Sequence, residues 1–278
     1  MIKAIFFDID GTLMSSQSRA LESTKQAITA AQAKGILCGI ATGRGPVDLA
    51  QRIDHLPMDM YVTYNGQLVF TDQLDLYRHP FEAEVLAEIV RFADEEFRQI
   101  IFGGRTRVDG SYLMQQSQGK WLKRLAGKMP TWFPVRASKK MMQKINTHRK
   151  PGRYSKLTII HEPIYQCVLY SAESEEAYLR KRLPNCSFQR SNPYSVDIIP
   201  KGGSKLLGIQ QFLSQNDLRL EEVMAFGDHL NDIEMLQGVA IGVAMGNAQT
   251  ETKAAADFVT KTNDDDGIYY ALKHYGIV

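Results

Sequence analysis

Cysteine is scarce in this sequence, with three residues among 278. Cys38, Cys167 and Cys186 are odd in number and lack the spacing of a metal site, so we expect free thiols in a reducing cytosol. No stretch approaches about 18 consecutive apolar residues, so no membrane span is expected. The start, MIKAIFFDID, meets an acid at position 8 and lacks the apolar core of a signal peptide. These absences predict a soluble, cytoplasmic protein.

What the sequence does contain is an ordinary globular composition, with 44% hydrophobic and 23% charged residues. Its length suits one large domain or two modest ones. The charge is unevenly distributed. Residues 82–192 hold 20 Lys and Arg against 11 Asp and Glu, whereas the rest of the chain holds 13 Lys and Arg against 20 Asp and Glu. Two parts of opposite charge indicate two domains with different roles.

Short apolar runs alternate with helical patterns at both ends of the chain. This alternation indicates βαβ units and a parallel sheet whose strands are buried on both faces. In the first part we expect strands at 3–9, 36–42 and 60–66, helices at 20–34 and 46–53, and a hairpin of 67–70 and 74–77. After 195–200 the pattern returns, with strands at 221–228, 239–245 and 258–262 and helices at 204–216, 231–239, 249–257 and 266–275.

The middle of the chain has a different, α+β pattern. We expect helices at 82–97 and 174–183 and short strands at 99–103, 156–161, 165–170 and 185–190. The simplest architecture is a parallel α/β core made of residues 1–81 and 193–278, with residues 82–192 inserted as an α+β domain.

Acidic residues gather where the expected strands end. Asp8 and Asp10 follow the first strand, and Asp228 and Asp232 belong to AFGDHLND after a later one. If the first strand extended to Asp10, both its carboxylates would share one face, which is costly without a cation between them. Open α/β sheets bind ligands outside the carboxyl ends of their strands, and oxygen ligands suit Mg²⁺. A metal together with a phosphate would stabilise the paired acids.

Two further loops supply groups suited to an anion. ATGR (41–44) ends a strand with Thr42 and Gly43, which offer a hydroxyl and backbone N–H groups. KGGSK (201–205) places Lys205 at a helix start after two glycines. Taken alone, each pattern has a plainer explanation, such as an Asp-Gly turn, a helix cap or a strand-to-helix turn. An EF-hand is excluded, because Gly11 comes too early. The occurrence of all four patterns in strand-end loops favours one shared site.

On these motifs the chain resembles the haloacid dehalogenase (HAD) superfamily, in its Cof-type branch with a type IIB (C2B) cap. The D-x-D-G-T motif is Asp8 to Thr12, the Thr of the second motif is Thr42, the motif lysine is Lys205, and G-D-x-x-N-D is 227–232. GVAMGNA and NDDDG are also typical of the branch. The resemblance implies a Rossmann-like core with an inserted α+β cap.

The resemblance also implies roles for individual residues. Asp8 is the nucleophile that forms an aspartyl-phosphate, and Asp10 protonates the leaving oxygen and then accepts a proton from water. Mg²⁺ is bound by Asp8, the backbone carbonyl of Asp10, and Asp228. The groups implied to hold the phosphoryl oxygens are Thr42, the amides near Ile9 and Gly43, Lys205 and Asn231. Asp232 is assigned to orienting Lys205 or a metal-bound water.

These residues predict a Mg²⁺-dependent phosphatase acting on small phosphorylated metabolites, chiefly sugar phosphates. The aspartate at the second position of D-x-D favours phosphoryl transfer over dehalogenation. A phosphomutase and a non-catalytic phosphate-ligand sensor remain as alternatives, although an intact nucleophile and acid argue against the sensor. We expect no membrane partner and a monomer or a dimer.

A basic segment lies within the inserted part. Residues 120–156 hold 12 Lys and Arg and no acid, with aromatic residues between them. The segment is compatible with a solvated basic surface, with electrostatic guidance of anionic substrates, or with nucleic-acid binding, which no other feature supports.

Overall fold

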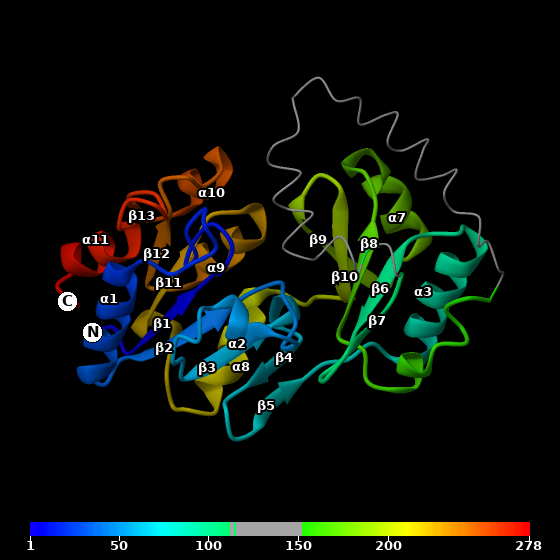
Figure 1. Ribbon diagram of the computed structural model, residues 1–278, viewed down its shortest axis with the longest axis horizontal. Helices are drawn as coiled ribbons and strands as arrows, with labels where there is room; N and C mark the ends of the chain where they lie inside the picture. Colours follow the sequence, from blue (N-terminus) through cyan, green and yellow to red (C-terminus); the bar gives the residue numbers. More distant parts are fainter. Residues whose placement is uncertain (112–113, 115–151) are drawn as a thin grey trace.

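The larger sheet of the protein has eight strands and lies in one of two lobes (Figure 1). This computed structural model describes residues 1–111, 114 and 152–278. The strands, in order across the sheet, are β13 (Phe258–Val259), β12 (Ile241–Ala244), β11 (Val223–Gly227), β1 (Ala4–Phe7), β2 (Leu37–Ala41), β3 (Met60–Thr63), β4 (Leu68–Phe70) and β5 (Asp75–Arg78). Those from β13 to β3 run parallel, and β4 and β5 form an antiparallel hairpin. The predicted α/β core is confirmed.

Helices cover both faces of this sheet, which explains why its central strand is apolar throughout. Ile5 and Phe7 of β1 pack on one face, while Ala4 and Phe6 pack on the other. The first face carries α1 (Glu22–Ala33), α2 (Leu49–Arg52) and α11 (Gly267–His274), and the second carries α8 (Lys205–Ser214), α9 (Ile233–Gly238) and α10 (Thr250–Ala255). All residues of β1 are fully buried as a result.

A five-stranded antiparallel sheet forms the second lobe (Figure 1). Its strands, in order, are β7 (Val108–Gly110), β6 (Ile100–Gly103), β8 (Gln166–Tyr170), β10 (Ser195–Pro200) and β9 (Cys186–Asn192). Helices α3 (Ala83–Glu95) and α7 (Glu176–Arg182) cover one face, against which Phe102, Cys167 and Val196 pack. The alternate residues of these strands point to the opposite face, which is turned toward the larger lobe.

Short 3₁₀ turns complete the described chain: η1 (Tyr64–Gly66), η2 (Thr158–His161), η3 (Glu173–Glu175), η4 (Leu220–Glu222) and η5 (Leu230–Asp232). The strand expected at 156–161 is wrong, because this stretch contains η2. From this turn the Ile159 side chain is fully buried among the apolar residues of the smaller lobe, so the apolar pattern is met without a strand. No helix among the described residues is long and apolar enough to cross a membrane.

The smaller sheet extends along the chain beyond the expected division at residue 192. Strand β10 pairs with both β8 and β9, so residues up to Pro200 belong to this sheet. The expected bounds of 82–192 for the insertion therefore leave out one of its strands. The three cysteines are free, as expected, and the structure buries all three. Most of the basic segment at 120–156 lies outside the described residues.

Candidate active site

The carboxyl ends of neighbouring parallel strands bring the motif residues together. Asp8 directly follows β1, Thr42 follows β2, and Asp228 follows β11. All three line a cavity of about 590 Å³ between the two sheets. The smaller sheet contributes the opposite wall, which includes Gln166 and Asp197. Asp10, Gly43 and Asn231 also line this cavity, as the shared-site expectation requires.

Lys205 lies behind the cavity as the cation between two buried carboxylates. Its Nζ atom donates to Asp8 Oδ1 and to Asp232 Oδ1, each at 2.6 Å, and its side chain is 1% exposed. The lysine is the first residue of α8, where the Ser204 hydroxyl accepts from the Leu207 amide and caps the helix. Two carboxylates on one ammonium compensate for burying its charge.

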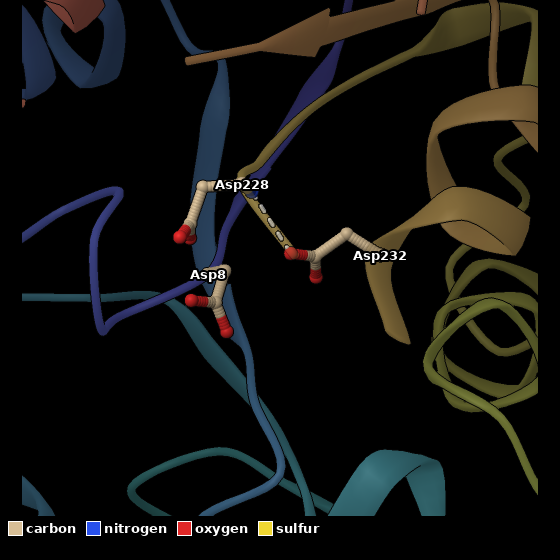
Figure 2. Close-up of side chains that lie close together, drawn as sticks. All are labelled: Asp8, Asp228 and Asp232. Carbon is tan, nitrogen blue, oxygen red and sulfur yellow. Dashed lines mark hydrogen bonds between the residues drawn. The ribbon is translucent and has the colours of Figure 1, made fainter. Parts of the chain in front are cut away.

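Three aspartates surround this point closely enough to share an ion. Asp8, Asp228 and Asp232 each offer a carboxylate oxygen within 4.8 Å of the others. Figure 2 shows their three side chains close together. The two oxygens of Asp232 already have partners, since Oδ1 accepts from Lys205 and Oδ2 accepts from the amides of Asp228 and His229, both at 3.0 Å. Asp232 therefore fixes Lys205 and the turn that carries Asp228.

Asp8 and Asp228 have the acceptor capacity that a divalent cation needs. Asp228 Oδ1 accepts from the buried Thr12 hydroxyl at 2.8 Å, which orients the carboxylate and leaves Oδ2 without a described donor. Asp8 Oδ2 likewise has no donor among the described residues, while Oδ1 is bound to Lys205. Two carboxylates of this kind suit Mg²⁺, which binds oxygen ligands and retains several waters. The donor set fits the expected metal.

Gly11 explains how the first loop passes so close to Asp228. Its φ of +88° lies in the left-handed region, and a Cβ there would collide with the Asp228 carboxylate. Glycine is the residue that meets both conditions. The D-x-D-G-T pattern therefore contains a steric requirement in addition to its carboxylates.

Burial perturbs the ionisation of the site. It raises the pKa of Asp8 against the opposing charge of Lys205, with Asp232 and Asp228 adding to the rise. Burial and the neighbouring Asp232 raise the pKa of Asp228 to about 7. Burial alone would lower the pKa of Lys205, but Asp232 and Asp8 outweigh it and raise that pKa above its usual value. Accumulated negative charge is therefore costly here, which favours a bound cation.

Asp10 lies beyond the end of the first strand and has a different partner from Asp8. Strand β1 ends at Phe7, so the two-residue periodicity does not extend to the second aspartate. The Asp10 side chain is 58% exposed and forms a two-point ion pair with the Arg44 guanidinium, in which Nη2 lies 2.6 Å from Oδ1. The two aspartates line one cavity but have different partners. Arg44 is part of the ATGR pattern, yet its role was not expected from the sequence.

Gln166 and Asp197 of the cavity wall, and the buried Asn65 that contacts both, were also not anticipated. Asn65 is 1% exposed, has a φ of +52°, and donates to Gln166 Oε1 at 3.0 Å and Asp197 Oδ2 at 3.1 Å. It also accepts from Asn231 Nδ2 at 3.2 Å. Burial raises the pKa of Asp197 to about 7, although the Asn65 hydrogen bond opposes the shift. The Asn-Gly pair at 65–66, typical of a tight turn, is the one sequence signal for this group.

Comparisons with known proteins agree over nearly the whole chain. The family model for haloacid dehalogenase-like hydrolases matches residues 5–272. A protein of Bacillus subtilis (strain 168) named "Putative phosphatase YkrA" is 31% identical over 99% of this chain and 98% of its own length. The structure of BT4131, described as a HAD subclass IIB sugar phosphatase, is 32% identical, with a TM-score of 0.78 over 99% of this chain and 100% of that one. The structure of BT1666 from Bacteroides thetaiotaomicron, described among the phosphatases of the superfamily, is 28% identical. Its TM-score is 0.78 over 100% of this chain and 96% of that one.

Proposed function

The chain belongs to the haloacid dehalogenase-like hydrolases, and we propose that it is a Mg²⁺-dependent phosphatase that hydrolyses phosphate monoesters of small metabolites, chiefly sugar phosphates, through an aspartyl-phosphate. The observation that carries this proposal is the buried Asp8 carboxylate, held by Lys205 at the floor of a cavity. The phosphatase names of the relatives and the sugar phosphatase among them support the class of reaction and substrate. We further propose a cytoplasmic monomer or dimer.

The proposed Mg²⁺ would be held by Asp8, the backbone carbonyl of Asp10, and Asp228. When bound, the ion supplies positive charge that reduces repulsion between the nucleophile and the phosphoryl oxygens. The chain prepares this position through Thr12, whose hydroxyl holds Asp228, and through Lys205, which carries part of the positive charge itself. Three clustered aspartates with one lysine retain a net negative charge, so the site favours a divalent ion.

In the first proposed step, Asp8 attacks phosphorus and the bond from phosphorus to the ester oxygen breaks. Asp10 gives its proton to that oxygen, which leaves as an alcohol. The Arg44 ion pair holds Asp10 in the structure, so Asp10 must leave Arg44 to reach the substrate. Thr42, the amides near Ile9 and Gly43, Lys205 and Asn231 would hold the phosphoryl oxygens as charge develops.

In the second step, water attacks the phosphorus of the aspartyl-phosphate. Asp10, now ionised, accepts a proton from this water, and inorganic phosphate leaves with regeneration of Asp8. Asp232 would keep Lys205 in place throughout, because its two oxygens bind that lysine and the turn after β11. The cavity wall of the smaller sheet would contact the leaving group.

The proposal is tested by measuring phosphate release from a panel of sugar phosphates, nucleotides and other phosphorylated metabolites, with and without Mg²⁺. Asp8→Asn is the matched control, because it retains the shape of the side chain and removes the nucleophile. Release that requires both Mg²⁺ and Asp8 supports the phosphatase. Little release without a bisphosphate activator would instead indicate a phosphomutase, and binding without any release would indicate a phosphate sensor.

A further inference from the structure

The two peptide groups that follow β2 are each fixed by a hydrogen bond from another segment. The backbone N–H of Asn65 donates to the Thr42 carbonyl at 3.0 Å. In a trans peptide the C=O and the following N–H point in opposite directions. The Asn65 contact therefore turns the Gly43 N–H away from η1. Among the described residues, none accepts a hydrogen bond from this N–H.

The next peptide group is held by the smaller sheet. The Gly43 carbonyl accepts from Gln166 Nε2 at 2.9 Å, and the Arg44 amide donates to Thr42 Oγ1 at 3.1 Å. Because Oγ1 accepts in this contact, the proton of the Thr42 hydroxyl is available to donate elsewhere. The loop thus presents two donors, the Gly43 N–H and the Thr42 hydroxyl, whose geometry depends on Gln166 and Asn65.

Gln166 is itself fixed in position. It belongs to β8, is 3% exposed, and its Oε1 atom accepts from Asn65 Nδ2 at 3.0 Å. Asn65 Nδ2 also donates to Asp197 Oδ2 of β10, and Asn65 Oδ1 accepts from Asn231 Nδ2. Both polar ends of the Gln166 side chain are therefore used, one on η1 and one on the loop after β2. This arrangement joins the two lobes at the loop that presents the donors.

We propose that Gln166 is a positioning residue for phosphate binding: by holding the peptide group between Gly43 and Arg44, it fixes the Gly43 backbone and, through the Arg44 amide on Thr42 Oγ1, aims the Gly43 N–H and the Thr42 hydroxyl at the phosphoryl group. The inference rests on the proposed function, because it assigns the phosphoryl group to these donors. Gln166 thereby gives the smaller lobe a role in binding the phosphoryl group of every substrate, whatever the leaving group. Contact with the leaving group alone would make the lobe matter only for particular substrates.

The test compares Gln166→Met with the wild-type protein. Methionine is similar in length and has no N–H donor, so the Gly43 carbonyl loses its partner. We expect inorganic phosphate, titrated calorimetrically in the presence of Mg²⁺, to bind about tenfold more weakly, the usual scale for one lost buried hydrogen bond. The same factor should reduce kcat/KM for p-nitrophenyl phosphate and for sugar phosphates. The NMR signal of the Gly43 amide should shift on phosphate addition in the wild type and much less in the variant.

Tyr170→Met is the matched control, because Tyr170 lies on the same strand and the same side of it but outside the cavity. It should bind phosphate as the wild type does. If Gln166→Met fails to fold, Gln166→Asn serves instead, since its shorter amide cannot reach Gly43. Its thermal unfolding, compared with that of Tyr170→Met, separates a fold defect from a binding defect.

Unchanged phosphate binding in a folded Gln166 variant overturns the inference, and so does a loss confined to esters with large leaving groups. Either of these results is distinguishable from a failure of the proposed phosphatase function. A wild-type protein that binds phosphate but hydrolyses no ester would refute the phosphatase, while the effect of Gln166 on binding would still be measured.

Discussion

Replacing Lys205 with methionine, which is similar in length but uncharged, removes the cation shared by Asp8 and Asp232. Nζ lies 2.6 Å from an oxygen of each carboxylate, and the lysine side chain is 1% exposed. Removing one partner of a buried ion pair costs about 3–5 kcal/mol. Repulsion between two carboxylates about 4 Å apart has the same scale, about 4 kcal/mol at an effective dielectric constant of about 20. We expect the free energy of unfolding at pH 8 to fall by about 3 kcal/mol.

Thermal unfolding in a chelating buffer measures this loss. For a chain of this size each kcal/mol lowers the unfolding temperature by about 2–4 °C, so a decrease of about 6–12 °C is expected. Lys201→Met is the matched control, because Lys201 lies in the same KGGSK loop and is exposed. Its unfolding temperature should stay close to that of the wild type, as exposed substitutions usually do.

The pH dependence separates charge repulsion from lost packing. Without Lys205 the carboxyl groups retain protons in the folded state that the unfolded state has already released, so stability falls as pH rises. Part of the deficit at pH 8 should therefore be recovered at pH 5. A variant as stable as the wild type at pH 8, or a deficit of equal size at both pH values, would refute the reasoning.

Three further predictions concern the metal and the acid. Because burial raises the pKa of Asp228 to about 7, the metal-free protein should lose stability as pH rises from about 4 to about 7. Added Mg²⁺ should therefore raise the unfolding temperature more at pH 8 than at pH 5.5, and equal increases at the two pH values would contradict this. Thr12→Val removes the hydroxyl that holds Asp228 and should weaken Mg²⁺ binding about tenfold in a calorimetric titration, whereas Thr12→Ser should not. Asp10→Asn should reduce kcat by about 10²–10⁴-fold for sugar phosphates but less for p-nitrophenyl phosphate, whose leaving group needs no proton, and equal losses would argue against Asp10 as the acid.

The sequence was most informative where burial leaves a local pattern. Strands of the parallel sheet are covered on both faces, so they are continuous apolar runs such as Ala4–Phe7, and each ends in a loop that carries a motif. Lys205 was distinguished from Lys201 by the helix-start pattern. The structure buries Lys205 against Asp8 and leaves Lys201 exposed.

Local patterns were least informative where pairing partners decide the structure. SVDIIP at 195–200 could have belonged to either sheet, because strand pairing is set by distant segments and not by the strand itself. The apolar residues of 156–161 suggested a strand, but Ile159 is buried from a 3₁₀ turn. The extent of β1 was likewise overestimated, because the strand ends at Phe7 and both aspartates lie in the loop that follows it.

The amides of the site carry no signal of their own in a single sequence. Asn65 and Gln166 are uncharged and about a hundred residues apart, and their importance arises only when the two lobes meet. Arg44 belonged to a recognised pattern, but its ion pair with Asp10 depends on how two loops approach. Charged motifs predicted which residues gather, while the hydrogen bonds that orient them required the structure.

Acid quenching during turnover, followed by mass spectrometry of the Asp8 peptide, tests the central claim most directly. A good substrate such as p-nitrophenyl phosphate is mixed with the wild-type protein and Mg²⁺, and the quenched protein is digested. The account predicts a phosphoryl group on Asp8 that is absent without Mg²⁺ and in Asp8→Asn. Continuous phosphate release with the label on another residue, or undiminished release by Asp8→Asn, would contradict it.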